Sequence, residues 1–324
     1  MKEGKIPSEL LRELVFNNIK LKHEDVILRP EIGEDCTAIA YGDFACVLST
    51  DPITGAEKGI GALAVHISCN DVASSGVKPI ALLMTIMAPT STTEEELGSI
   101  MKDAGEAAAE LGVEIAGGHT EITSAVNKVI ISTTAIGKCL KDKLVKTSGA
   151  QIGDDVLMTK YAGLEGTAIL ANDREAELSD ILTPDQLKKA KELSKLISVV
   201  REGVIAAEFG VNSMHDVTEG GILGAAWEVA ESSSTGVEID LEKIPLLEET
   251  KKICQKYNID PYRLISSGSM IITCKNGALL KEKLQEAGIS SEIIGTILPE
   301  GRILMEQGKP GELLPPDTDE LFKA

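Results

Sequence analysis

The stretch GIGALAVHISCNDVASSGVKPIALLMTIM, residues 59–87, predicts a helix, a glycine stop and then an apolar strand. Leu63, Ile67 and Asp71 follow one another at intervals of four residues, so they share one face of the helix. A carboxylate on an apolar face is unfavourable unless a cation meets it, and acids are also disfavoured at a helix C-terminus. We therefore expect a metal ion at Asp71. The alternative is a solvated last turn that contains Asn70, Asp71 and the serines after them.

The composition indicates a folded protein of two domains. The chain has 324 residues, of which 43% are apolar and only 3% aromatic, so its cores are built from Val, Ile, Leu and Ala. The formal charge of −19 and the lack of a basic run argue against a nucleic-acid partner. An anionic substrate would need Mg²⁺ to approach such a surface.

The cysteines and the opening segment indicate where the protein resides. The six cysteines form no CxxC pair and no zinc-ligand spacing, which is typical of reduced thiols. Residues 1–16 are amphipathic and mixed in charge, unlike a signal peptide, and no apolar run approaches the ~20 residues of a membrane span. We expect a cytoplasmic protein without a membrane partner.

The rest of the sequence predicts alternating helices and strands, with a domain boundary near residue 148. We expect an N-terminal domain over 1–148, a C-terminal domain over 149–324, and polar last residues that lie on the surface. The expected helices are 8–20 with Ser8 as N-cap, 93–111, 166–172, one or two within 184–208, and one that ends at 231. The expected strands are 37–40 and 44–49, joined by a turn, then 113–116, 128–136, 156–159 and 211–214.

The two halves resemble each other. Residues 61–77 align without gaps on residues 221–237, and Asp71 falls on Glu231 in that register. Each of these helices follows a strand that ends in an acid, Asp51 or Asp216. A duplicated α/β unit explains the shared order, and it predicts two equivalent strand-end clefts.

Three acidic residues form the main candidate site. Asp35, Asp51 and Asp71 lie at loops or element ends, where their carboxylates could converge. Oxygen ligands of this kind suit Mg²⁺ together with phosphates and water. The alternative is that each is an ordinary solvated acid.

A second candidate motif is GGHTE at 117–121, which follows an expected strand. Its glycines could let the backbone approach a phosphate, or they could form a plain turn. His119 and His215 adjoin candidate motifs, whereas His66 is expected to pack inside its helix. The sequence contains no phosphate-binding loop of the GxxxxGK[ST] type and no kinase signature, and residues 59–64 match the dinucleotide fingerprint without its later acid.

Taken in order, these motifs resemble those of the aminoimidazole ribonucleotide (AIR) synthase superfamily. They are GEDC at 33–36, Thr50-Asp51, Asn70-Asp71 followed by SSGVKP, GGHTE, and DVTEGG at 216–221. The resemblance covers nearly the whole chain. It implies a mixed α/β, two-domain fold, in which the N-terminal half forms a β-barrel across a homodimer and is followed by a C-terminal α/β domain. It also implies ATP and Mg²⁺ in a cleft near that interface.

Carried over position by position, the resemblance assigns roles to individual residues. Magnesium would be held by Asp35, Asp51 and Asp71, and the nucleotide also by Asn70, Gly117, Gly118, His119 and Thr120. The candidates for catalysis are His119, Glu121 and Asp216. The substrate cleft would be lined by Gly166, Thr167, Asp216, Thr218, Glu219 and Gly220.

Within the superfamily the chain is most similar to the hydrogenase maturation protein HypE, with departures. GKIPSELL and HDVTEGGILGA resemble HypE segments, but the sequence ends TDELFKA without the cysteine of a HypE tail. The HypE loop GDTK is replaced by Gly118-His119-Thr120-Glu121. We expect an ATP- and Mg²⁺-dependent enzyme that phosphorylates a small-molecule or protein-borne substrate, with a partner in a maturation complex. The alternatives are a kinase of the thiamine-monophosphate type and a non-catalytic nucleotide-binding partner protein.

Overall fold

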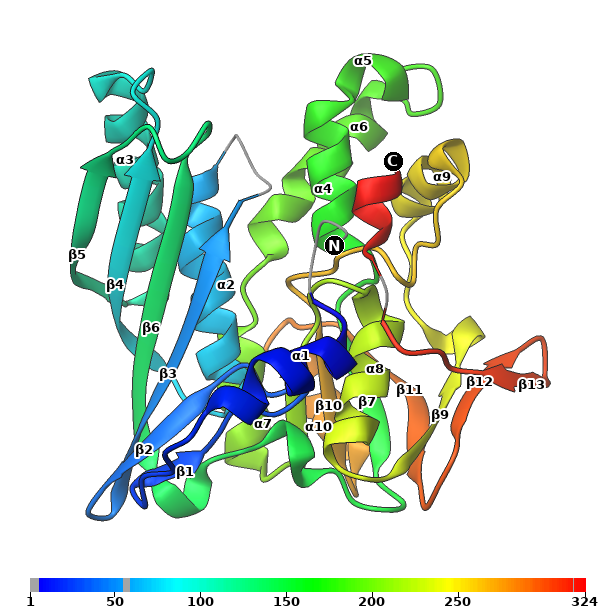
Figure 1. Cartoon of the computed structure of the whole chain (residues 1–324). Helices are drawn as coiled ribbons and strands as arrows, with labels where there is room; N and C mark the ends of the chain where they lie inside the picture. Colours follow the sequence, from blue (N-terminus) through cyan, green and yellow to red (C-terminus); the bar gives the residue numbers. More distant parts are fainter. Residues whose placement is uncertain (1–5, 55–58, 317) are drawn as a thin grey trace.

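The computed structural model describes residues 6–54, 59–316 and 318–324, and it contains two sheets with their covering helices (Figure 1). The first sheet has the strand order β1-β2-β3-β6-β4-β5, and the second has the order β13-β12-β9-β11-β7-β10-β8. The mixed α/β class predicted from the sequence is confirmed. Residues 141–154 connect β6 to β7, and the predicted boundary at 148 lies in this connection and stays a prediction.

The first sheet is covered on one face by two helices. α2 (Ile60–Ser74) and α3 (Glu94–Leu111) pack on it around an aliphatic core. Thr93 begins α3 with a capping box to Glu96, as the Thr followed by acids predicts. The strands are β1 (Val26–Leu28), β2 (Thr37–Tyr41), β3 (Phe44–Ile53), β4 (Pro79–Ala88), β5 (Glu114–Ile122) and β6 (Ile130–Leu140).

The second sheet is mostly antiparallel, with one parallel pair between β9 and β12. One end of this sheet is buried on both faces: every residue of β10 and of the edge strand β8 is buried. The strands are β7 (Asp155–Thr159), β8 (Ser213–Asp216), β9 (Gly236–Asp240), β10 (Met270–Cys274), β11 (Ser291–Leu298), β12 (Arg302–Glu306) and β13 (Lys309–Glu312). The helices are α4 (Leu164–Asp173), α5 (Glu175–Leu178), α6 (Pro184–Glu192), α7 (Val200–Phe209), α8 (Gly221–Ser232), α9 (Glu248–Tyr257) and α10 (Gly277–Glu286).

α2 joins the two halves. The side-chain amide of Asn70 donates a 2.8 Å hydrogen bond to the carbonyl of Ile197 and accepts one of 2.8 Å from the N–H of Val199. A Cβ atom on Gly203 of α7 would lie 2.2 Å from the carbonyl oxygen of Ala73, so α7 packs on α2 with no room for a side chain at this glycine. The helix predicted from the opening stretch is therefore the element against which both halves pack.

The first helix and β3 have other boundaries than predicted. The first helix is α1 (Ser8–Leu14), followed by a 3₁₀ turn at Phe16–Asn18, instead of one helix to residue 20. Its N-cap is Pro7 instead of Ser8. β3 runs to Ile53 because it pairs with β6 throughout, so Asp51 lies inside the strand opposite Thr133.

Much of the end of the chain is exposed, as predicted, but a few of its residues pack into the second half. Asp319 is 1% exposed and accepts hydrogen bonds from the N–H groups of Gly220 and Leu321, both at 2.8 Å. Leu321 contacts the apolar cluster formed by α4, α6 and α9. The prediction missed these buried residues because the polar composition of the segment does not reveal a buried carboxylate that accepts hydrogen bonds from backbone N–H groups.

Among the described helices, none is both long and apolar enough to cross a membrane.

Candidate functional site

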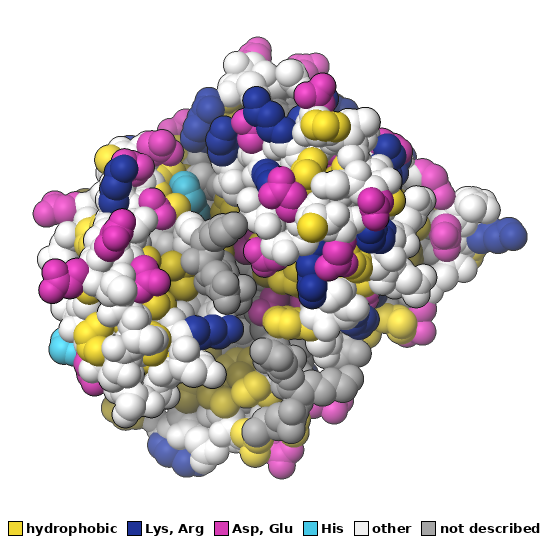
Figure 2. Space-filling model, turned by 90° about the horizontal axis from the view of Figure 1, so that it is seen from above, with side chains coloured by type: hydrophobic (Ala, Val, Ile, Leu, Met, Phe, Trp, Pro, Cys, Tyr) yellow, Lys and Arg dark blue, Asp and Glu magenta, His cyan; other side chains and the backbone are white. Residues whose placement is uncertain are grey.

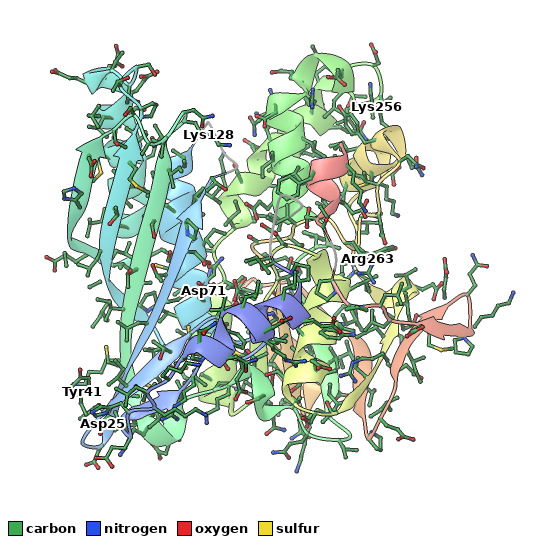
Figure 3. All side chains as sticks on the ribbon, viewed as in Figure 1. Asp25, Tyr41, Asp71, Lys128, Lys256 and Arg263 are labelled. Atoms are coloured by element: carbon green, nitrogen blue, oxygen red, sulfur yellow. The ribbon has the colours of Figure 1, made fainter. Side chains whose placement is uncertain are left out.

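Asp71 lies in the interior, on the last turns of α2 (Figure 3). Its side chain is 1% exposed, and Ser49 of β3 donates a 2.5 Å hydrogen bond to Oδ2. The following serines, Ser74 and Ser75, are buried as well. The alternative of a solvated last turn is therefore wrong.

Four carboxylates converge at this position. Burial raises the pKa of Asp71 well above its ordinary value, and the charges of Asp216, Asp51 and Asp35 raise it further, in that order of effect. The structure thus brings together the three acids expected to hold magnesium. It also places Asp216, at the end of β8, beside them instead of in a separate second cleft. The sequence feature that pointed to Asp216 is the internal repeat, in which Asp51 and Asp216 occupy matching positions.

A buried histidine bridges the two halves beside these acids. His215 is 2% exposed, and its Nδ1 lies 3.2 Å from Oδ2 of Asp35, while Nε2 lies 3.1 Å from Oε2 of Glu228. Burial alone would lower the pKa of His215, but the hydrogen bonds and charges of Asp35 and Glu228 together raise it well above its ordinary value. The imidazole is therefore held as a cation between two carboxylates.

Glu34 belongs to the same surroundings. Burial chiefly, and then the charge of Asp35, raise the pKa of Glu34 to about 7, against the opposing effect of His215. Glu34 Oε2 accepts a hydrogen bond of 3.3 Å from the N–H of Thr147, in the connection between the halves. Within the GEDC motif, Asp35 therefore lies among the four converging carboxylates, and Glu34 binds the segment that connects the two halves.

The donor atoms of this cluster fit a hard cation. Ligand atoms of Asp35, His215 and Asp216 all lie within 4.8 Å of one another. Carboxylate oxygens are the ligands that Mg²⁺ prefers, whereas a protonated imidazole has no lone pair to offer. The acids, with His215 as their counter-charge, are the part of the site that could hold a metal. We call Asp35, Asp51, Asp71 and Asp216 the acidic cluster.

GGHTE is not a loop but part of β5, an edge strand paired in parallel with β4. Gly118 has φ +146°, and a Cβ there would lie 1.8 Å from the carbonyl oxygen of Met84, so strand pairing alone requires this glycine. His119 Nε2 and Glu121 Oε2 are 3.6 Å apart on exposed side chains. Because β6 and β4 separate β5 from β3, the motif is about 14 Å from the strand that carries Asp51.

The remaining residues assigned to the nucleotide lie on β5, except Asn70, which lies on α2. The predicted contacts of Gly117, Gly118, His119 and Thr120 with ATP, and the catalytic roles of His119 and Glu121, stay predictions. Both polar ends of the Asn70 amide are engaged by the backbone of Ile197 and Val199, so its place in a nucleotide site is also a prediction only.

The residues predicted to line a substrate cleft are packed against other elements. A Cβ on Gly166 would lie 2.4 Å from Cγ of Leu264, and the hydroxyl of buried Thr167 lies 2.8 Å from that of Thr250. In the DVTEGG motif, the carbonyl of Thr218 accepts a backbone hydrogen bond from Gly221. The motif's Gly220 N–H donates to Asp319, and Glu219 is near enough for its charge to raise the pKa of Asp319. The end of the chain therefore covers this motif.

Comparisons with known proteins agree with the fold and with the motifs. The family model described as AIR synthase related protein, N-terminal domain, matches residues 33–139, and the corresponding C-terminal domain matches residues 151–306. A Methanocaldococcus jannaschii protein named for hydrogenase expression/formation is 31% identical over 306 residues, covering 90% of this chain and 88% of that protein. Carbamoyl dehydratase HypE of Cupriavidus necator is 26% identical, with coverage of 92% and 85%.

Other members of the superfamily are similar too. Thiamine-monophosphate kinase of Pyrococcus horikoshii is 28% identical, with coverage of 82% of each chain. Among solved structures, HypE in a HypE–HypF complex superposes with a TM-score of 0.78 at 23% identity, covering 95% of this chain and 99% of that one. A HypE structure in complex with ATP superposes with a TM-score of 0.70 at 21% identity, with coverage of 99% and 97%. At these identities the structural matches show a shared fold.

Two matched domains that together span most of the sequence, and a relative 31% identical over nearly the full length, lead to one conclusion: the chain belongs to the AIR synthase related protein family, with HypE proteins among its relatives.

Proposed function

We propose that this protein is a HypE-like, ATP- and Mg²⁺-dependent enzyme that activates a small-molecule or protein-borne substrate by phosphorylation. The observation that carries the proposal is the acidic cluster, in which a 1% exposed Asp71 meets three further carboxylates. Buried like charges raise the free energy of the folded protein unless a cation or protons compensate them. Such an arrangement is expected where a metal ion and its anionic ligand are to be bound.

The carboxylate donors of the cluster suit Mg²⁺. Mg²⁺ usually takes one or two carboxylates, keeps several waters and binds phosphate oxygens of a substrate. In this chain Asp71 and Asp216 would hold it from the interior, and Asp35 and Asp51 from the rim. When bound, Mg²⁺–ATP would supply the phosphoryl group that activates the acceptor.

His215 would position Asp35 in this site. Its imidazole ring is fixed on one side by Glu228 of α8 and on the other by Asp35. The ring can therefore orient one oxygen of Asp35 and leave the other for a ligand. Hydrogen-bonded supports of this kind commonly set the geometry of metal ligands.

We further propose that a second copy of the chain covers the outer face of the first sheet. That face carries Phe44, Ile80, Leu83 and Leu140, each between 42% and 52% exposed. A broad apolar face on an open sheet is unfavourable in water and usually marks an interface. A β-barrel formed across a homodimer, as the family resemblance implies, would bury it.

Two candidate functions differ in the molecule that accepts the phosphoryl group of ATP. HypE is named as a carbamoyl dehydratase in one relative, and another relative is a thiamine-monophosphate kinase. A solved structure contains HypE in a complex with HypF. The dehydratase function would therefore also involve a maturation partner protein.

Titration calorimetry and ADP release test the proposal. ATP should bind in the presence of Mg²⁺ and much more weakly in EDTA. ADP should then be released with one of two acceptors, thiamine monophosphate or a carbamoylated thiol peptide. Release with the first would identify a kinase, and release with the second a dehydratase. Mg²⁺-dependent binding without release in either case would support the non-catalytic partner, and no Mg²⁺-dependent binding at all would contradict the proposal.

A further inference from the structure

The acidic cluster takes its carboxylates from both halves of the chain. Asp35, Asp51 and Asp71 belong to the first half, whereas Asp216 ends β8 of the second half. A groove of about 1340 Å³ separates α2 and α3 from α4 and α7, and the space-filling view shows the surface hollowed between the halves (Figure 2). The spacing of the four carboxylates therefore depends on the contacts that hold the halves together.

One such contact is made by residues 196–199, which lie between α2 and the end of β7. On one side, the side chain of Asn70 binds the backbone of this segment through two hydrogen bonds of 2.8 Å. On the other side, Nζ of Lys160 donates hydrogen bonds of 3.1 and 2.7 Å to the carbonyls of Leu196 and Ser198. The segment is thus held from both halves of the chain.

The same segment leads directly into the elements that carry Asp216. α7 begins at the residue after it, and β8 follows α7. Gly203 of α7 lies against the carbonyl of Ala73, two residues after Asp71 on α2. A shift of residues 196–199 would therefore move α7 and β8 relative to α2.

The ammonium group of Lys160 also holds the backbone beside Asp216. Its Nζ donates a third hydrogen bond, of 2.8 Å, to the carbonyl of Gly268. The next residue, Ser269, accepts a 3.0 Å hydrogen bond from the N–H of Val217, which directly follows Asp216. One side chain therefore contacts both the segment that α2 binds and the backbone next to an acid of the cluster.

Lys160 is fixed in this position by its charge and by its backbone. Its Nζ lies 2.5 Å from Oε1 of Glu202 on α7, and the two side chains are only 12% and 3% exposed. Its φ of +54° is a left-handed conformation, which is unfavourable for a residue that has a side chain. Strained residues of this kind persist where several contacts determine them, and they are frequent at functional sites. The ammonium group thus has one carboxylate that compensates its charge and three carbonyls that it joins.

We propose that Lys160 is a positioning residue for the metal site: by joining residues 196–199 to the backbone beside Asp216, it sets the distance between Asp216 and Asp71. The inference rests on the proposed magnesium site and deepens it, because it names a residue outside the acidic cluster on which that site depends. Removing a hydrogen-bonded support of a metal ligand commonly weakens metal binding by about 10–100-fold.

The alternative is that Lys160 and Glu202 form an ordinary buried ion pair. Replacing both members of such a pair by apolar residues often leaves stability unchanged, because the desolvation of the charges is removed together with their attraction. The two interpretations differ in the carbonyls. A positioning role requires the hydrogen bonds that Lys160 donates to them, and an apolar side chain cannot make these bonds.

Binding of Mn²⁺ alone to the full chain, measured by electron paramagnetic resonance, tests the proposal. Mn²⁺ takes the same oxygen ligands as Mg²⁺. Lys160→Met/Glu202→Leu removes the two charges together with the hydrogen bonds to the carbonyls. We expect this double variant to unfold in urea close to the parent and to bind Mn²⁺ more weakly by about tenfold or more.

Two control variants separate positioning from charge. Glu202→Gln removes the carboxylate charge and leaves the three carbonyl hydrogen bonds, so it should bind Mn²⁺ as the parent does. Lys281→Met/Glu292→Leu removes another ion pair of the second half, 2.7 Å long and between α10 and β11, and should also leave the affinity unchanged.

Lys160→Arg decides the same question if the double variant does not fold. Arginine keeps the positive charge beside Glu202, but its planar guanidinium group donates in other directions than an ammonium group. Positioning predicts weaker Mn²⁺ binding in Lys160→Arg, and an ordinary ion pair predicts the affinity of the parent.

The outcomes distinguish this inference from the proposed function. Parent-like Mn²⁺ affinity in Lys160→Met/Glu202→Leu, or in Lys160→Arg where the double variant does not fold, would overturn the positioning role. An equal loss of affinity in Glu202→Gln would overturn it too. A parent that binds no Mn²⁺ would contradict the metal site and this inference together, whereas a parent that binds Mn²⁺ but no ATP would contradict the proposed function alone.

Discussion

The hydroxyl group of Ser49 donates a 2.5 Å hydrogen bond to Oδ2 of Asp71 inside the protein, and so ties β3 to α2. The bond fixes one oxygen of a carboxylate that is surrounded by Asp35, Asp51 and Asp216. Ser49 is itself 4% exposed, so water does not compete for this bond. The interior therefore holds a positioned acid whose charge the chain compensates only in part.

His215→Gln should destabilise the protein by about 3–5 kcal/mol at pH 7, since it removes the cation between two buried carboxylates. The folded-state pKa of His215 is raised, so its contribution is fully present below the unfolded pKa and is lost only as the pH rises through the folded value. Urea unfolding without Mg²⁺ measures the difference. His23→Gln, on a side chain 62% exposed, is the control and should change stability by less than about 0.5 kcal/mol. Equal losses in both variants would show that His215 is not an internal cation.

Glu165→Gln should stabilise the protein more at pH 8 than at pH 5. The folded protein binds the Glu165 proton more tightly than the unfolded chain, because its pKa is raised from 4.5 to about 7. Stability therefore falls as the pH rises from 4.5 through 7, by about 3 kcal/mol, and the glutamine variant escapes this fall. Denaturant unfolding of parent and variant across pH 5–8 measures it, with the exposed Glu282→Gln as control. A constant difference between parent and Glu165→Gln at all pH values would refute the prediction.

Leu83→Lys should convert the proposed homodimer into monomers, because it places a charge on the apolar outer face of the first sheet. Leu83 is 44% exposed on β4. Leu279, 50% exposed on α10, supplies the control Leu279→Lys, which should remain dimeric. Sedimentation velocity at micromolar concentration distinguishes the species. A parent that sediments as a monomer would contradict the dimer itself.

Incubation with ATP and a carbamoyl-transferring partner should leave no carbamoyl or cyano adduct on this chain. Four of its cysteines are buried, and burial raises the pKa of Cys254 to about 12 and that of Cys274 to about 11. Such thiols carry almost no thiolate at neutral pH and are poor nucleophiles. Intact-mass spectrometry of the protein is the measurement. A mass increase that a thiol-blocking reagent prevents would show that a cysteine of this chain carries the group.

The sequence predicted local features better than distant contacts. The helix over residues 60–74, the apolar strand that follows it and the capping box at Thr93 follow from periodicity and N-cap chemistry, which act over a few residues. The convergence of Asp35, Asp51 and Asp71 could also be predicted, because the motifs occur in a recognisable order. For Asp216 the internal repeat indicates only a position that matches Asp51, and its place beside the other acids depends on how α7 and β8 pack against α2.

The errors share a physical cause. GGHTE has the composition of a loop, yet pairing with β4 extends the strand through its glycines. Gly166 and Thr167 pack against Leu264 and Thr250 because of the helical phase of α4, and their predicted place in a substrate cleft stays a prediction. The buried end at Asp319 depends on N–H groups from residues 220 and 265. Pairings of this kind are set by tertiary packing, and no local pattern encodes them.

The most direct test of the acidic cluster is the shift in melting temperature that Mg²⁺–ATP produces in the parent and in Asp71→Asn. Asparagine keeps the shape of the side chain and removes one buried charge, so this variant should fold and melt no lower than the parent without ligand. ATP at about 100 times its dissociation constant should stabilise the parent by roughly 2.7 kcal/mol in the presence of Mg²⁺. Asp43→Asn, in the exposed turn between β2 and β3, is the matched control and should keep this shift. Loss of the Mg²⁺-dependent shift in Asp71→Asn alone is the predicted result, and equal shifts in the parent and both variants would contradict a magnesium–nucleotide site at Asp71.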